Sequence, residues 1–214
     1  SEIIQFLTAT LNANGSYTLS GLYRGQRGTD WACTSHTAGE VFVLLNESSF
    51  TGDSYPSSAV SSTWYYRAVT FNSFVDSGNA KAVVLSGAAL KPYPVANVSR
   101  ATSGSNLVVS WSRRTRVGGG MVDGTGTVPL NEATEAYEAY VLAAAPNLAT
   151  FDPTKPTTYL RAFTGLTSPP FTYTSSQMAA DSFSLSGSAL HVVVYQISGT
   201  VNRGYPSVAN LPPK

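Results

Sequence analysis

Apolar and polar residues alternate with a period of two along much of the chain, which is the pattern of half-buried β-strands. Residues 17–21 alternate in this way, and an apolar stretch begins at residue 3. Residues 12–15, with the sequence NANG, separate the two. Because Asn and Gly favour tight turns between strands, this arrangement predicts a β-hairpin.

Three apolar runs follow in the first 91 residues. Residues 41–45 read VFVLL and are continuously apolar, which predicts a buried strand. Residues 64–71 are rich in aromatic and β-branched side chains, with Arg67 expected on the exposed side, and a further run covers 81–90. We therefore expect a small antiparallel β domain, a sheet or a barrel, over residues 1–91.

The segment 131–145 is the best candidate for a helix, because it contains three Glu and many Ala. Tyr137, Ala139 and Val141 nevertheless alternate with other residues in the manner of a strand. We expect a strand over about 135–143.

Residues 91–94 read KPYP, so that a proline stands on each side of the tyrosine. This predicts a domain boundary, because proline favours extended backbone and donates no backbone hydrogen bond. After the boundary, short strand-like runs fill about 120 residues and predict a two-sheet β-sandwich over 92–214. Besides 135–143, these runs are 95–101, 105–111, 157–163, 170–174, 190–198 and 206–211. The fold class expected is all-β.

Composition then excludes several kinds of function. Charged residues form 12% of the 214 residues, about half the usual share, and the formal net charge is +1. This gives no electrostatic basis for binding nucleic acid or an anionic membrane surface. Cys33 is the only cysteine, and His36 and His191 are far apart in sequence, so we expect no disulfide, metal or cofactor. No apolar run approaches the roughly 20 residues of a membrane helix. We expect no signal peptide before the first strand, and we expect the chain to be a piece of a longer protein.

The stretch 17–32, YTLSGLYRGQRGTDWA, is unusually rich in Gly and Arg. A phosphate-binding loop of the GxxxxGK[ST] type would need a Lys followed by Ser or Thr, and this stretch has neither in place. Its glycines instead suit tight turns with positive φ. We expect Arg24 and Arg27 to be held by backbone carbonyls or by a carboxylate such as Asp30, with a contact to a neighbouring subunit or domain as the alternative.

A second charged cluster has arginines before a run of glycines and acidic residues after it. These residues are Arg113, Arg114 and Arg116, followed by Asp123, Glu132 and Glu135. We expect the arginines to pair with the acids and to brace a long loop over 113–131; the alternative is that this loop is a binding edge. The candidate assembly or receptor contacts are therefore Arg24, Arg27, Arg113, Arg114 and Arg116.

Catalysis has little support in the sequence. Asp30, Ser35 and His36 are the residue types of a hydrolase triad, but no GxSxG nucleophile motif is present. His191, at the start of an apolar strand, is expected to be a packed or edge residue. We expect no catalytic residue and no enzymatic activity.

Several motifs resemble parts of a fibronectin type III domain. Pro94 leads into VxNV, and LxVSW at 107–111 follows, which is similar to the first two strands with Trp111 as the core tryptophan. Residues 137–141 would form the third strand, and 191–209 resemble the last hairpin. The long basic loop after Trp111 departs from the ordinary module.

A wider resemblance covers the whole chain. It is similar to the C-terminal part of the large tail-tip proteins of siphophages and gene transfer agents, which are baseplate hub or host-specificity proteins. The motifs that carry it, in order, are YTLSGLYRGQRGTDWA, HTAGEVFVLL, YYRAVT, ALKPY, SWSRRTRVGG, DGTGTVPLNEATEAYE and VYQISGTVNRGYPS. The glycosidase-like barrel that lies upstream in this family has no counterpart here, so its activity is not implied.

The resemblance implies a structural module of a virion, at the tail tip or baseplate, that contributes to tail assembly and host attachment. Its partners would be other tail-tip proteins, in a trimer in the full-length protein. The isolated fragment is expected to be monomeric, because the sequence shows no heptads and no long apolar patch. The alternative is a module that binds a glycan or receptor on the bacterial surface. Aromatic residues that would stack on sugar rings are Tyr55, Trp64, Tyr159, Phe171 and Tyr173.

Overall fold

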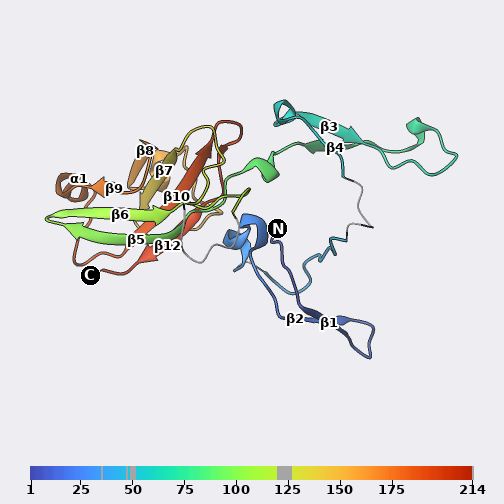
Figure 1. The fold of residues 1–214 in the computed structure, drawn as a ribbon, viewed down its shortest axis with the longest axis horizontal. Coiled ribbons are helices and arrows are strands. Elements are labelled where there is room, and N and C mark those ends of the chain that lie inside the picture. Colours follow the sequence, from blue (N-terminus) through green and yellow to red (C-terminus); the bar gives the residue numbers. More distant parts are fainter. Residues whose placement is uncertain (35, 47, 49–51, 120–126, 214) are drawn as a thin grey trace. The chain divides into compact units, whose positions relative to one another are not determined.

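The computed structural model confirms an all-β chain, and the chain divides into two units (Figure 1). One unit contains Ser1–Thr37 and Pro92–Lys214, and the other contains Ala38–Lys91. This division differs from the expected one, because the first 37 residues associate with the sandwich. The structure describes residues 1–34, 36–46, 48, 52–119 and 127–213.

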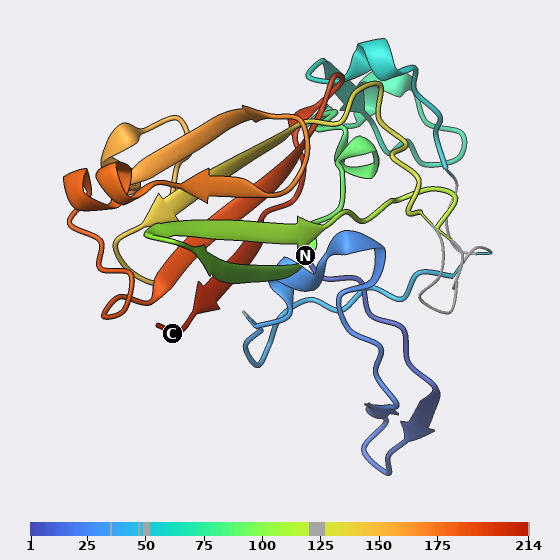
Figure 2. The same ribbon diagram turned by 60° about the vertical axis from the view of Figure 1, so that its left-hand side comes forward.

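The larger unit contains a β-sandwich of two antiparallel sheets (Figure 2). One sheet has the order β5-β6-β9, and the other has the order β8-β7-β10, with β11 and β12 both paired to β10. The bounds are β5 Ala96–Ser103, β6 Asn106–Ser112, β7 Tyr137–Leu142, β8 Arg161–Leu166, β9 Phe171–Tyr173, β10 Leu190–Ser198, β11 Asn202–Arg203 and β12 Ser207–Leu211. The sandwich expected after residue 92 is therefore present.

The inward faces of the two sheets form one apolar core. Trp111 of β6 is 6% exposed and packs edge-on against Tyr137 of β7, with 5.2 Å between ring centroids. Phe163 of β8 stacks on Phe171 of β9 at 4.2 Å. These cross-sheet aromatic pairs confirm that Trp111 is the core tryptophan, and the strand expected at 135–143 is also confirmed.

The short helix α1, Ser175–Ala180, was missed by the sequence analysis. Thr174 caps its first turn by accepting a hydrogen bond from the backbone N–H of Gln177, whose side chain accepts one from the backbone N–H of Thr174. The sequence TSSQ carries this capping-box signal, so the helix start was detectable. Short 3₁₀ helices are η1 Gln26–Gly28, η2 Asp30–Ala32, η4 Ser57–Ala59, η5 Val75–Ser77, η6 Ala88–Leu90 and η7 Pro156–Thr158.

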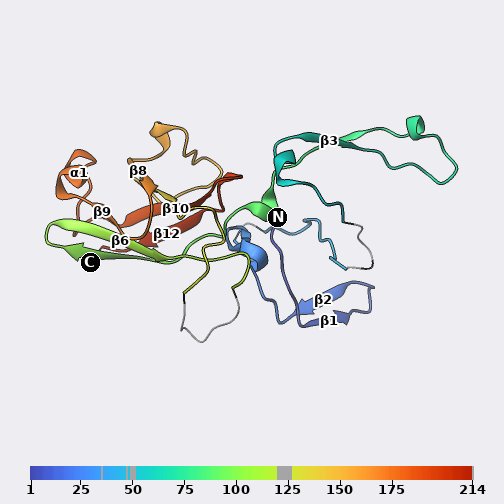
Figure 3. The same ribbon diagram turned by 45° about the horizontal axis from the view of Figure 1, so that its top comes forward.

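The hairpin expected near the N-terminus is present. Strands β1, Thr8–Leu11, and β2, Tyr17–Ser20, pair antiparallel and lie side by side (Figure 3). Gly15 has φ +83° in the connecting turn, a conformation that glycine adopts without strain.

The unit Ala38–Lys91 has a different character, since none of its described residues is buried. Its strands β3, Thr63–Tyr66, and β4, Lys81–Val84, pair antiparallel. The buried strand expected at 41–45 is wrong: these residues belong to no strand, and their side chains are 55% to 90% exposed. The reason is that the described residues of this unit form no second layer of structure that would cover them.

Candidate functional site

The Gly/Arg stretch is anchored by Glu2, an acidic residue that the sequence analysis missed. Its side chain is fully buried, and it accepts hydrogen bonds from Arg24 Nε at 2.7 Å and Nη2 at 2.6 Å. The backbone N–H of Gly25, the thiol of Cys33 and Nε2 of His36 also contact this carboxylate. Chiefly because of Arg24, the pKa of Glu2 falls to about 2.

The turn that follows has an unusual backbone. Gly25 and Gly28 have φ +64° and +77°, and Arg27 between them has φ +56°. A Cβ atom on Gly25 would lie 2.7 Å from Cα of Asp30, and one on Gly28 would lie 2.3 Å from the Tyr93 ring. Both glycines are therefore required by close approach as well as by φ. The structural turn expected from the sequence is present.

The second charged cluster is paired largely as expected. Arg113 forms an ion pair with Glu135 at 2.9 Å and donates to the carbonyl of Val128, and Arg116 contacts Glu132 at 3.4 Å. Burial raises the pKa of Tyr137, whose hydroxyl donates to Glu135. The remaining acidic residue of the cluster, Asp123, lies outside the described residues.

The two clusters meet through Arg114. Its Nη1 donates to Asp30 Oδ2 at 2.9 Å, although 84 residues separate the two in sequence. The guanidinium of Arg114 also lies over the ring of Tyr93, 5.6 Å from the centroid. Asp30 therefore binds Arg114, not Arg24 or Arg27 as the sequence suggested. From the sequence, Tyr93 between its two prolines indicates only a domain boundary.

The meeting of the clusters forms an open pocket of about 580 Å³ within the larger unit. Of the expected contact residues, Arg24, Arg27, Arg114 and Arg116 line it, whereas Arg113 does not. The lining is polar and includes the Asp30 carboxylate. The site is thus a set of guanidinium groups gathered from distant segments.

Two of the three residues expected as a hydrolase triad lie in the described part of the chain, and each contacts another residue. His36 contacts Glu2, Asp30 contacts Arg114, and Ser35 lies outside the described residues. His191 pairs with Asn210 at the sandwich surface. In the described ranges, no group of three His, Cys, Asp or Glu side chains is placed to hold a metal ion, and no helix has the length and apolarity to cross a membrane.

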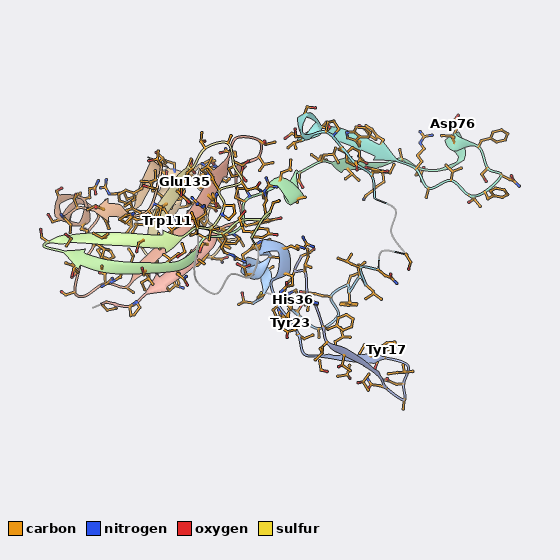
Figure 4. All side chains as sticks on the ribbon, viewed as in Figure 1. Tyr17, Tyr23, His36, Asp76, Trp111 and Glu135 are labelled. Atoms are coloured by element: carbon orange, nitrogen blue, oxygen red, sulfur yellow. The ribbon has the colours of Figure 1, made fainter. Side chains whose placement is uncertain are left out.

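The aromatic residues named for sugar stacking are scattered. Phe171 and Tyr173 are buried in the sandwich core, and Tyr159 packs against Tyr140 with 5.0 Å between ring centroids. Tyr55 and Trp64 lie together, but their rings are inclined at 67°. No pair among the five presents the coplanar, exposed rings that sugar stacking would favour. Figure 4 gives the positions of the side chains, with His36 and Trp111 labelled.

Comparison with known protein families matches only the start of the chain. Residues 1–43 match the family model described as Rcc01698-like, C-terminal, a family associated with gene transfer agents. A search of curated proteins gave no match. The matched segment contains Glu2, Arg24, Arg27 and Asp30, and so contributes one side of the pocket.

Proposed function

We propose that this chain is a non-enzymatic structural module of a phage-type tail tip or baseplate hub protein. In this proposal it contributes to tail assembly and host attachment. The observation that carries the proposal is the exposed apolar surface of residues 38–91. The family match over 1–43, with its link to gene transfer agents, supports the same class of particle.

Exposure of these apolar side chains to water is unfavourable, and no burial within the described part of the unit offsets it. Val41 to Leu45 present five consecutive apolar side chains, and Phe71 and Phe74 are about 90% and 87% exposed. A two-stranded hairpin such as β3–β4 is marginally stable alone in water. Contiguous exposed apolar residues mark interaction surfaces. These residues would gain their cover from neighbouring proteins of a tail.

The sandwich, in contrast, buries its apolar side chains within the chain itself. Its core is closed, with Tyr137, Tyr173 and Leu107 fully buried between the sheets. Such a unit holds its shape without partners and is suited to support the segments that make contacts. We propose the virion tail tip as its location, other tail-tip or baseplate proteins as its partners, and a trimer as the state of the full-length protein.

The alternative function is recognition of a glycan or receptor on the bacterial surface. Tyr55 and Trp64 are the named aromatic residues that support it, because both lie outside the sandwich core. Their inclined rings offer one stacking face at most. Assembly therefore has the stronger support.

The test is a double substitution in the intact particle, Phe42→Ser with Leu44→Ser. Because neither side chain is buried within the chain, folding of the module is expected to be unchanged, while tail assembly or adsorption falls at least tenfold. The matched control is Val208→Ser, which alters an apolar side chain of the sandwich that is 39% exposed. Normal tails and normal adsorption in the double variant would contradict the proposal. A glycan array probed with the purified chain tests the alternative.

A further inference from the structure

We propose that the pocket lined by Arg24, Arg27, Arg114 and Arg116 is a binding site for a small anionic group, a phosphate or a carboxylate. This site is distinct from the apolar run at 41–45 on which the proposed function rests. Either proposal can therefore fail while the other stands.

The positive charges of the pocket are not all neutralised by its own carboxylates. Three of its guanidinium groups have carboxylate partners: Arg24 pairs with Glu2, Arg114 with Asp30 and Arg116 with Glu132. The guanidinium of Arg27 forms no hydrogen bond or ion pair with any residue that the structure describes. The pocket thus holds one positive charge more than its own carboxylates neutralise.

The backbone at Arg27 has an unfavourable conformation. A positive φ is unfavourable for a residue with a side chain, by about 1–2 kcal/mol, and Arg27 adopts φ +56°. Glycine would occupy this position without that cost, as it does at Gly25 and Gly28 on either side. Sparsely populated backbone conformations cluster at functional sites. The strain is explained if the guanidinium itself is needed.

The size and lining of the pocket suit a small anionic group. The pocket volume of about 580 Å³ lies within the range of small-molecule sites. Arg24 and Arg114 are held in place by their carboxylates, and the guanidinium of Arg114 also lies over the ring of Tyr93. A guanidinium matches the paired oxygens of carboxylates and phosphates. Asp30 is the carboxylate in the lining, and Arg114 neutralises it.

The experiment follows backbone amide NMR signals of the purified chain at low salt. The probes are inorganic phosphate and glucuronate, with glucose as the uncharged control. Binding is expected to shift the signals of Gly25 and Gly28 with both charged probes and not with glucose. The ratio of the two affinities distinguishes a phosphate site from a carboxylate site, and raising the salt concentration is expected to weaken both.

Substitutions at Arg27 decide the outcome. Arg27→Gly removes both the guanidinium and the backbone strain, so it is expected to weaken binding at least tenfold while leaving the melting temperature equal or higher. Lys81→Gln, which removes one exposed positive charge from β4, is the control and is expected to bind as the unmodified chain does. The proposal is overturned if neither charged probe shifts these signals, if glucose shifts them equally, or if Arg27→Gly binds with unchanged affinity.

Discussion

The guanidinium of Arg24 holds the buried carboxylate of Glu2 through two hydrogen bonds, of 2.7 and 2.6 Å. This pair ties the first residues of the chain to the Gly/Arg turn, since Gly25, Cys33 and His36 contact the same carboxylate. The turn in turn supplies one side of the arginine pocket. A single acidic residue therefore organises one half of the candidate site.

Glu2→Gln is expected to loosen this turn. The pKa of Glu2 is lowered from 4.5 to about 2 in the folded protein, chiefly by Arg24. A lowered pKa means that the charged carboxylate stabilises the fold fully above about pH 5 and that this contribution is lost as the pH falls towards 2. Faster hydrogen exchange of the Gly25 amide at pH 6 in the variant is the measurement.

The control for this substitution is Asp53→Asn, which removes an exposed carboxylate outside the sandwich unit. It is expected to leave exchange at Gly25 unchanged. If Glu2→Gln also left the exchange rate and its pH dependence unchanged, the anchoring role of Glu2 would be wrong.

Gly28→Ala is expected to destabilise the larger unit more than Gly15→Ala does. Both glycines have positive φ, +77° and +83°, so alanine costs about 1–2 kcal/mol at either position. Only at Gly28 would the new Cβ overlap a neighbour, the Tyr93 ring at 2.3 Å, whereas Gly15 has open space. Overpacking adds about 1–3 kcal/mol.

Chemical denaturation of the two alanine variants measures this difference directly. Equal losses in the free energy of unfolding would show that the contact between the turn and Tyr93 contributes nothing.

The sequence predicted the sandwich well because its signals are local. Alternation at 107–111 and the run at 190–198 specify strands without knowledge of their partners. The run at 41–45 has an equally strong apolar signal, but burial depends on a covering layer, and the residues of 38–91 that the structure describes form none. Local pattern cannot report whether that layer is present.

Local sequence pattern is also insufficient to predict which charged residues pair in the pocket. The sequence indicates Arg24, Arg27, Arg114 and Arg116 individually, but it suggests the wrong arginines as partners of Asp30. Ion pairs across 84 residues, such as that between Arg114 and Asp30, have no local signature. The prediction of such a pair requires the fold, which brings η2 and the segment after β6 together.

Trp111→Ala is expected to lower the free energy of unfolding of the sandwich by about 3–5 kcal/mol, the range for large aromatic truncations in cores. Trp111 is 6% exposed, and it contacts Tyr137 of the opposite sheet and Phe171 of its own sheet. Trp64→Ala is the matched control: Trp64 is 43% exposed, and its loss is expected to cost less than about 1 kcal/mol. Urea unfolding followed by far-ultraviolet circular dichroism measures both; similar losses would contradict the packing argument.

The exposed run at 41–45 leads to a prediction about association. The sequence suggested no apolar patch and hence a monomer, but the structure exposes five consecutive apolar side chains there. Burial of apolar area stabilises by about 25 cal/mol per Å², and association must first offset several kcal/mol of lost rotational and translational freedom. So short a run therefore favours weak self-association.

Light scattering on the purified 22.6 kDa chain is expected to give the monomer mass at low micromolar concentration. At some hundred micromolar the mean mass is expected to rise, and Phe42→Ser with Leu44→Ser is expected to abolish that rise. Val208→Ser is expected to associate as the unmodified chain does. A stable trimer at low micromolar concentration, unaffected by the double substitution, would place the assembly surface elsewhere in the chain and would contradict the use of the exposed run as the support for the proposed function.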